Sequence, residues 1–351
     1  MRVRNTVRYA IGAMAAISLF AGCSSRGSQV APFLGPSGQS GPQSTVRTDS
    51  RFVYSTGLAK RYPQVARPAE KSWMRHVNAR RPLTYIADFL GGSVTVLDRS
   101  ANLIGFIGGL TNPNGIFVDS NRNLWVANEY ANDILEFARG TTSPSTVLAD
   151  PNQYPVDVTI CPNGTVYASN LFAGPSGTGS ISVYAAGSTS PTGMLSYPGQ
   201  NWNYFVTCDT AGNVFTTLFT SSGAAAVVKY PGGNQSGATV LAIPLLFPGG
   251  IKLDNDGNLL VNDQQARTVT EYTEAGNPTG NSITYGDSTN DWVDIAVTRN
   301  SRVVAGADAL LIQGTSVVFP SGAPRQIYHV PTGPSGNMPF GIAFDLGQNG
   351  I

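Results

Sequence analysis

Short apolar segments recur along the chain at intervals of about 45 residues, a period that indicates a repeat architecture. Each interval holds a first apolar segment, a turn rich in Asn, Asp and Gly, and further short apolar segments. The last residues of the first segments are 42, 48, 45 and 44 positions apart. These segments are 113–119, 155–161, 204–209, 248–254 and 292–298. Alternating or fully apolar runs of this length between turn residues predict β-strands, so the pattern indicates an all-β protein.

The two ends of the repeated region complement each other. A single unit cannot bury both faces of its small sheet, so the copies are expected to pack face to face in a ring. The chain finishes on a lone first strand, 339–345, whereas the opening unit, 83–107, lacks that strand. We therefore predict a six-bladed β-propeller over 82–351 that is closed by the C-terminal strand pairing with the N-terminal blade.

The repeated unit reads Pro-x-Gly-Ile-x-x-Asp, followed by Gly-Asn-Leu-x-Val, and is clearest at 113–137 and 248–272. It resembles the NHL repeat, whose six-bladed propellers include SMP-30/gluconolactonase and streptogramin-lyase-like proteins. The resemblance implies the fold but leaves the activity open, because propellers serve as hydrolases, lyases and binding modules. SMP-30-like lactonases hold a divalent metal with a Glu, an Asn and an Asp, and here no Glu occupies a rim position, although Glu129 follows Asn128. Streptogramin-lyase-like enzymes rely on histidine, and the histidines are His76 in the N-terminal extension and His329 in a loop.

If the Gly-Ile strand is innermost, as in the resembled family, polar residues meet at one mouth of the channel. One set ends the second strands: Asp88, Asn128, Asn170 and Asp263, with Leu218 and Ala307 at the matching positions. In the inner strands, Asp157 and Asp294 lie three blades apart and are expected to face each other across the axis. An oxygen-rich rim suits a hard cation such as calcium, for which Asp157 and Asp294 are the candidates.

Aromatic residues accompany this rim, among them Trp202 and Trp292. Aromatic walls with a few polar groups suit a sugar or another small polar ligand. The alternative is structural, because an Asp or Asn at such a position commonly caps the next turn.

Cys161 and Cys208 end first strands of adjacent blades, offset by one position. In an oxidising compartment they are predicted to form a disulfide. The alternative is a pair of buried thiols whose Cβ atoms point apart.

Residues 1–22 have the features of a lipoprotein signal peptide. Three arginines precede the apolar run 10–21, which is too short to span a bilayer. Residues 19–23 resemble the bacterial lipobox, which implies cleavage before Cys23 and acylation of that residue. The lipid bilayer of the bacterial cell envelope is then the first partner. Ser24, in place of Asp, favours the outer membrane, with the propeller periplasmic or surface-exposed.

Residues 23–81 are predicted to form a lipid anchor and a disordered basic tether. A short helix over 68–80 would place Trp73, Met74 and Val77 against the folded domain. The formal net charge of +1 conceals a division of charge between these parts. Ten basic and two acidic residues give +8 over 24–81, and nine basic and nineteen acidic residues give −10 from residue 82 onward. An acidic propeller argues against nucleic acid and favours cationic partners, metal ions or the tether itself.

The sequence carries no Gly-x-Ser-x-Gly, P-loop or paired catalytic carboxylate pattern. We therefore expect a membrane-anchored, non-catalytic propeller that binds a small molecule, glycan or protein at the channel mouth. It is expected to be a monomer that requires no cofactor, with a divalent cation such as calcium as the ion that the rim would accept. One alternative is a metal-dependent, lactonase-like hydrolase using Asp157, Asp294, Asn128 or Asn170. The other is a structural envelope protein.

Overall fold

The computed structural model describes residues 71–78, 81–173, 177–330 and 337–345. The predicted signal peptide, Cys23 and the tether up to residue 70 lie outside the described residues. Among the described residues, no helix has the length and apolar character needed to cross a membrane.

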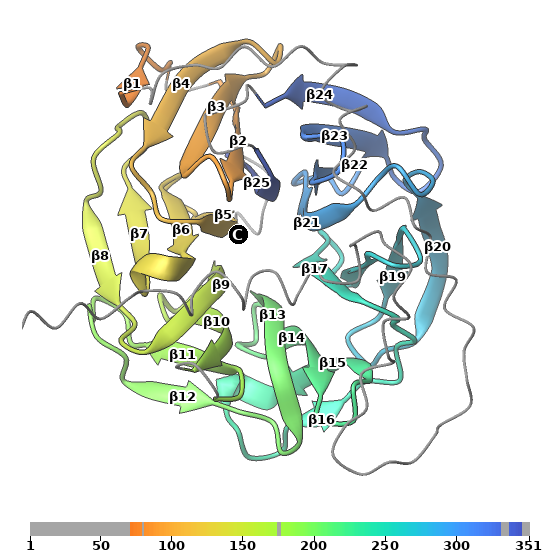
Figure 1. Ribbon diagram of the computed structural model, residues 1–351. Coiled ribbons are helices and arrows are strands. Elements are labelled where there is room, and N and C mark those ends of the chain that lie inside the picture. The colour runs from red at the N-terminus through yellow and green to blue at the C-terminus, as the bar shows by residue number, and fades with distance from the viewer. Residues whose placement is uncertain (1–70, 79–80, 174–176, 331–336, 346–351) are drawn as a thin grey trace, which may run out of the picture. The chain divides into compact units, whose positions relative to one another are not determined.

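Six antiparallel sheets surround a central axis, and each sheet is one blade of the predicted propeller (Figure 1). Blade 1 contains, from the axis outward, β25 (Pro339–Phe344), β2 (Leu83–Asp88), β3 (Ser93–Asp98), β4 (Leu103–Gly108) and β1 (Trp73–Met74). Blade 2 contains β5 (Pro113–Val118), β6 (Leu124–Asn128), β7 (Asp133–Phe137) and β8 (Thr146–Ala149). Blade 3 contains β9 (Gln153–Ile160), β10 (Val166–Ala173), β11 (Ser180–Tyr184) and β12 (Gly193–Leu195).

The remaining blades follow the same order. Blade 4 contains β13 (Gln200–Cys208), β14 (Val214–Thr220), β15 (Ala225–Tyr230) and β16 (Thr239–Val240). Blade 5 contains β17 (Pro248–Leu253), β18 (Leu259–Asp263), β19 (Thr268–Tyr272) and β20 (Pro278–Thr284). Blade 6 contains β21 (Trp292–Val297), β22 (Val303–Asp308), β23 (Gln313–Val318) and β24 (Arg325–His329). Two short 3-10 turns, η2 (Glu129–Ala131) and η3 (Pro231–Gly233), complete the described elements.

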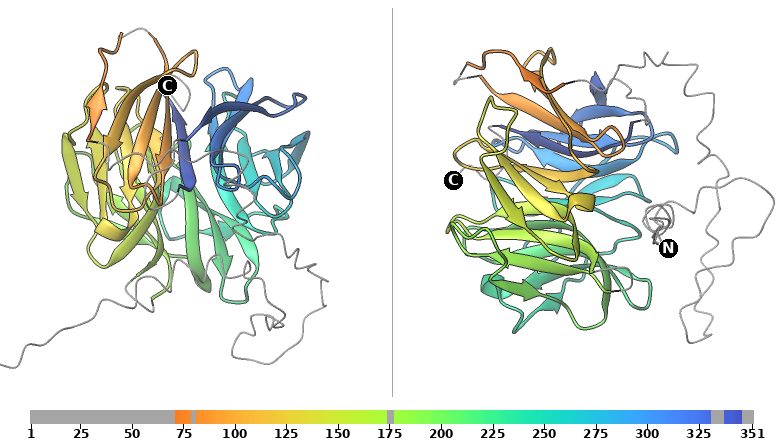
Figure 2. Two further views of the ribbon diagram at one scale, coloured as in Figure 1. Left: turned by 45° about the horizontal axis from the view of Figure 1, so that its top comes forward. Right: turned by 60° about the vertical axis from the view of Figure 1, so that its left-hand side comes forward.

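The C-terminal strand closes the ring, as the sequence predicted. Strand β25 pairs antiparallel with β2, from Thr84 opposite Phe344 to Asp88 opposite Pro339. Figure 2 shows the blue β25 beside the orange β2. Because β2 otherwise lacks an inner partner, this pairing supplies hydrogen bonds to a sheet edge that would be exposed in an open ring.

Charged groups hold the end of the closing strand. The carboxylate of Asp345, which is fully buried, accepts a hydrogen bond from Arg122 Nε at 3.1 Å and also pairs with Arg139. Both guanidinium groups donate to the backbone carbonyl of Arg81, where the chain enters blade 1. Residues from the two ends of the ring and from blade 2 therefore share one ion-pair cluster.

The helix expected over 68–80 is not present in the described part of that segment. Trp73 and Met74 instead form β1, which pairs with Phe106 and Gly105 on the outer edge of β4. A Cβ on Gly105 would lie 2.2 Å from the Met74 sulfur, so the absence of a side chain there makes room for Met74. Met74 and Val77 pack against buried residues of blades 1 and 2. The expected contact with the folded domain is thus made by a strand, because β4 offers an open edge of backbone donors and acceptors.

The apolar core lies in the layers between blades. Each buried cluster combines residues of two neighbouring blades, such as Val94 and Val96 of blade 1 with Ile116 and Val126 of blade 2. Near the axis the backbones approach too closely for most side chains. A Cβ on Gly115 would lie 2.3 Å from Asp157 Oδ1, which accounts for the glycine of the Pro-x-Gly-Ile motif.

Candidate functional site

The inner strands begin, and the second strands end, at one mouth of the ring, which we call the aromatic mouth. Three of the predicted rim residues cap chain connections there. Asp88 Oδ1 accepts hydrogen bonds from the backbone N–H groups of Gly91 at 3.0 Å and Met338 at 2.8 Å. Asn128 Oδ1 accepts from Thr111 at 2.6 Å, and Asp263 Oδ2 accepts from Leu246 at 2.7 Å. These oxygens hold loops in place, so the three residues have the structural, capping role that was the alternative to ligand binding.

Asn170 of blade 3 and Asp308 of blade 6 occupy equivalent positions in their second strands. Asn170 is fully buried, and its Nδ2 donates to Ser180 Oγ at 3.1 Å and Ser182 Oγ at 2.9 Å. In blade 6 the residue opposite Trp292 is Asp308 rather than Ala307, so the predicted alignment was wrong there by one position. Asp308 Oδ1 accepts from the backbone of Asp291 and Leu311 at 3.1 Å each, which is again a capping role.

Asp157 and Asp294 do converge near the axis, but a lysine lies between them. Lys252 Nζ of β17 is 3.4 Å from Asp157 Oδ2 and 3.3 Å from Asp294 Oδ1. All three side chains are at least 97% buried, with exposed fractions of 3% for Lys252 and 0% for both aspartates. Burial lowers the pKa of Lys252, but Asp157 and Asp294 raise it by more, so the pKa lies above its ordinary value and the ammonium stays protonated.

The two carboxylates do not fit the predicted divalent metal site. An ammonium already occupies the space between them, and its positive charge would repel a second cation. Among the described residues, no group of three or more His, Cys, Asp or Glu side chains could hold a metal ion. His329, expected in a loop, ends strand β24.

Aromatic side chains line the aromatic mouth over five of the six blades, and we call this set the aromatic arc. Its members are Phe89, Tyr130, Tyr154, Phe172, Trp202, Tyr204, Phe219, Phe247 and Phe340. Ring centroids are 5.5 Å apart for Tyr130 and Tyr154 and 4.4 Å apart for Tyr154 and Phe172. Tyr130, Tyr154, Phe172, Trp202, Phe219 and Phe247 are half-buried, so part of each remains accessible.

The two predicted tryptophans have different positions. Trp202, at the start of β13, belongs to the arc and contacts Phe219 edge to face at 6.3 Å. Trp292 is fully buried and stacks on Tyr285 with ring centroids 4.3 Å apart. Its faces are therefore used in the core between blades 5 and 6 and are not presented to the mouth.

Glu129 directly follows Asn128 and was not among the predicted rim residues. It opens η2 directly after β6, and only 3% of it is exposed. Its Oε2 accepts a hydrogen bond from Asn114 Nδ2 of β5 at 3.0 Å. Burial raises the pKa of Glu129 to about 8 despite this bond. The 3-10 turn, which alternation of apolar residues does not reveal, is what turns this side chain inward.

Tyr204 of β13, a member of the aromatic arc, lies close enough to Glu129 for the two groups to interact electrostatically. Burial raises the pKa of the Tyr204 phenol, and the nearby negative charge of Glu129 raises it further. The Tyr204 hydroxyl is buried without a hydrogen-bond partner, as is Asn114 Oδ1. The centre of the aromatic mouth therefore carries a buried acid, an amide and a phenol beside aromatic rings.

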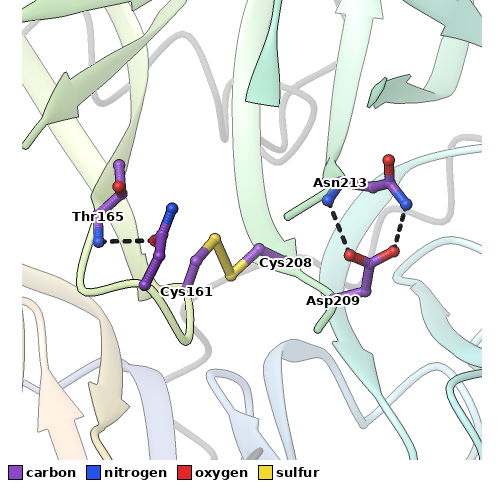
Figure 3. Close-up of a disulfide and its surroundings, with 6 residues drawn as sticks. Cys161, Thr165, Cys208, Asp209 and Asn213 are labelled. Carbon is purple, nitrogen blue, oxygen red and sulfur yellow. Dashed lines mark hydrogen bonds between the residues drawn. A yellow bond between two sulfur atoms is a disulfide. The ribbon is translucent and has the colours of Figure 1, made fainter. Parts of the chain in front are cut away.

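The opposite mouth, where inner strands end, holds a cavity of about 880 Å³ that the sequence did not predict. Its lining includes Cys161 and Cys208, which the structure joins in a disulfide with Cα atoms 5.7 Å apart (Figure 3). The neighbouring Asp209 accepts hydrogen bonds from the backbone and side chain of Asn213 at 2.7 and 2.6 Å. Asp254 similarly accepts from the backbone of Asn258 at 2.8 Å. These aspartates at the cavity mouth are thus engaged in the turns of their own blades.

The fold is a six-bladed β-propeller, and the similarity to known structures concerns this fold. No family model matches the chain, and no curated protein matches it. A chain of the nidogen/laminin complex is similar with a TM-score of 0.61 and 14% identity, over 76% of this chain and 99% of that one. A functionally unknown protein from Desulfotomaculum acetoxidans has a TM-score of 0.51 and 12% identity, over 75% of this chain and 98% of that one. Regucalcin from Agrobacterium tumefaciens, a calcium-binding protein, has a TM-score of 0.48 and 15% identity, over 63% of this chain and 75% of that one. At such identities the likeness concerns the fold alone.

Proposed function

We propose that this protein is a lipid-anchored binding propeller that takes a small ligand at the aromatic mouth without transforming it. The observation that carries the proposal is the aromatic arc around the buried Glu129, Asn114 and Tyr204. Aromatic walls with a few converging polar groups are the usual composition of a small-molecule site. Unpartnered buried polar atoms at that site support the same conclusion, because burying them without a partner costs stability.

The lactonase-like hydrolase has less support. Its metal would have to lie near Asp157 or Asp294, and the Lys252 ammonium pairs with both. Of the other polar candidates, Asn128 Oδ1 already accepts a hydrogen bond. Asn170 Oδ1 is buried without a partner, but among the described residues no group of three or more His, Cys, Asp or Glu could hold a metal ion. Metal analysis after mild dialysis tests this alternative, because one tightly held divalent ion per chain would favour the hydrolase over the binding protein.

The binding site is tested by thermal shift against a panel of small sugars, amines and aromatic acids. Tyr154→Ala removes a half-buried ring from the middle of the arc. Met194→Ala, a residue that is 57% exposed on the outer strand β12, is the matched control. A ligand at 100 times its Kd stabilises the folded state by about 2.7 kcal/mol, which for a domain of this size is roughly 5 °C in Tm. Ligands should stabilise the wild type and Met194→Ala and not Tyr154→Ala, and equal shifts in all three proteins would rule out the aromatic mouth.

Anchoring is a separate part of the proposal and rests on the N-terminal sequence. Cells producing the wild type should incorporate labelled palmitate into the protein and retain it in the outer-membrane fraction. The Cys23→Ser variant should do neither, because its acyl acceptor is gone. If both proteins fractionate alike, the lipid anchor is wrong. Capture of the same envelope component by wild type and Tyr154→Ala would favour a structural envelope role instead.

A further inference from the structure

Most of the unpartnered buried polar atoms of the inner strands are oxygens, although the Asn203 and Trp292 side chains also leave a nitrogen unpartnered. Asn114 Oδ1, Asp157 Oδ1 and Asp294 Oδ2 have no hydrogen-bond partner, and the exposed fractions of these residues are 6%, 0% and 0%. The bond from Asn114 Nδ2 to Glu129 fixes the amide orientation, so the free atom of Asn114 is its oxygen. All three atoms accept hydrogen bonds and donate none while Asp157 and Asp294 are ionised. Asn114 Oδ1 lies on the side chain that bonds to Glu129, so a ligand that reached it would satisfy it with a hydrogen-bond donor.

The balance of charge points the same way. Asp157, Asp294 and Glu129 are three buried carboxyl groups near the axis, and Lys252 is the cation that pairs with two of them. Glu129 receives a hydrogen bond from a neutral amide rather than from a basic side chain. A positive charge beside Glu129 would favour its ionised form and would offset the cost of burying it.

The surroundings of Glu129 suit an organic cation better than an inorganic one. Tyr130 follows Glu129 in the chain and contacts Tyr154 edge to face, and Tyr154 packs against Phe172. Aromatic faces attract ammonium groups, and several rings around one position recognise alkylated ammonium in particular. A sugar would also stack on these rings, but it would not favour the ionised form of Glu129.

We propose that the ligand of the aromatic mouth is an organic cation, an amine or quaternary ammonium compound, whose charge lies among the rings of the aromatic arc and faces Glu129. This inference rests on the proposed binding function and specifies its ligand class. Tyr204, whose hydroxyl can accept as well as donate, supplies one further contact to an ammonium that carries hydrogens.

The test compares choline with 3,3-dimethylbutan-1-ol, which has the same shape without the charge. Binding of both compounds to the full chain is measured by titration calorimetry at pH 8.5. Wild type should bind choline at least tenfold more tightly than the alcohol. Glu129→Gln should reduce that preference to less than threefold. Glu274→Gln, a partly exposed acid at the opposite mouth, should leave the preference unchanged.

Each outcome decides the ligand class. Equal affinities of wild type for the two compounds would overturn the cation preference while leaving the binding site in place. Absence of detectable binding with about 10 mM choline, tenfold above a Kd of 1 mM, would also overturn it. If Glu274→Gln removes the choline preference as fully as Glu129→Gln does, the preference comes from the overall negative charge of the propeller and not from the aromatic mouth. That result would also overturn the proposal. The proposed function itself fails separately, when ligands from the thermal-shift panel stabilise Tyr154→Ala as much as wild type.

Discussion

Replacing Lys252 by methionine removes the ammonium between Asp157 and Asp294 and keeps most of the side-chain volume. Both carboxylates are fully buried, and the ammonium lies 3.3–3.4 Å from them. Removing one partner of a buried ion pair typically costs about 3–5 kcal/mol, because the remaining charge stays desolvated. For a domain of this size the entropy of unfolding is roughly 0.6 kcal/mol per degree, so Tm should fall by about 5–9 °C at pH 8.

The dependence on pH identifies the cause. Burial raises the pKa of Asp157 and of Asp294, while Lys252 lowers both. Without Lys252 both pKa values rise further above their unfolded values. A group with a raised folded pKa contributes stability below its unfolded pKa and loses it as pH rises through the folded pKa. The Lys252→Met variant should therefore gain stability relative to wild type as the pH is lowered from 8 to 5.

Thermal unfolding followed by circular dichroism at pH 5, 6.5 and 8 measures both effects. Lys229→Met is the matched control, because the Lys229–Glu274 pair is 3.1 Å long but partly exposed. Exposed pairs contribute about 0–1 kcal/mol, so this control should lose less than 2 °C and show little pH dependence. A Lys252→Met protein as stable as wild type at pH 8, or with a deficit that does not change with pH, would refute the argument.

Three further perturbations test the ring. Removing the Cys161–Cys208 disulfide by serine substitution should cost about 4 kcal/mol of stability for a sequence separation of 47. Thiol titration of the denatured, unreduced Cys23→Ser protein should find no free thiol, and two free thiols would contradict the disulfide. Deleting 339–351 removes β25 and should give oligomers in gel filtration with a lower Tm, and a monomer with unchanged Tm would contradict closure. Gly115→Ala should lower the free energy of unfolding by about 1–3 kcal/mol, because the new Cβ would lie 2.3 Å from a carboxylate oxygen of the next blade. Urea unfolding measures this loss, and an unchanged midpoint would contradict the close approach.

The fold was predictable because its signals are local and repeated. Three of the first strands, β5, β13 and β17, are followed by a turn of the type Asp-x-x-x-Asn, in which Asp119, Asp209 and Asp254 accept a hydrogen bond from the backbone N–H four residues later. Such turns fix where a strand stops without any distant contact. The spacing of these units also placed Cys161 and Cys208 at neighbouring strand ends, where the structure joins them.

The candidate site was less predictable because its contacts join distant parts of the chain. Lys252 lies in an otherwise apolar strand and meets residues 95 and 42 positions away along the sequence, across the axis of the ring. Glu129 is turned inward by a single 3-10 turn that leaves no periodic signal. In β22 the run Val-Val-Ala-Gly-Ala-Asp has no strong apolar alternation, and Asp308 was therefore missed by one position.

The sequence by itself determined that six units of short strands form a ring closed by the C-terminal strand, because turn residues and apolar alternation act within each unit. Only the tertiary structure decided what the polar residues near the axis do. The radius of the ring sets which side chains meet there, and at that radius Lys252 reaches two aspartates that had been predicted to face a metal ion. The same geometry brings Glu129 and the aromatic arc to one mouth and a cavity lined by a disulfide to the other. Distances across the axis depend on all six blades at once, so no single stretch of sequence encodes them.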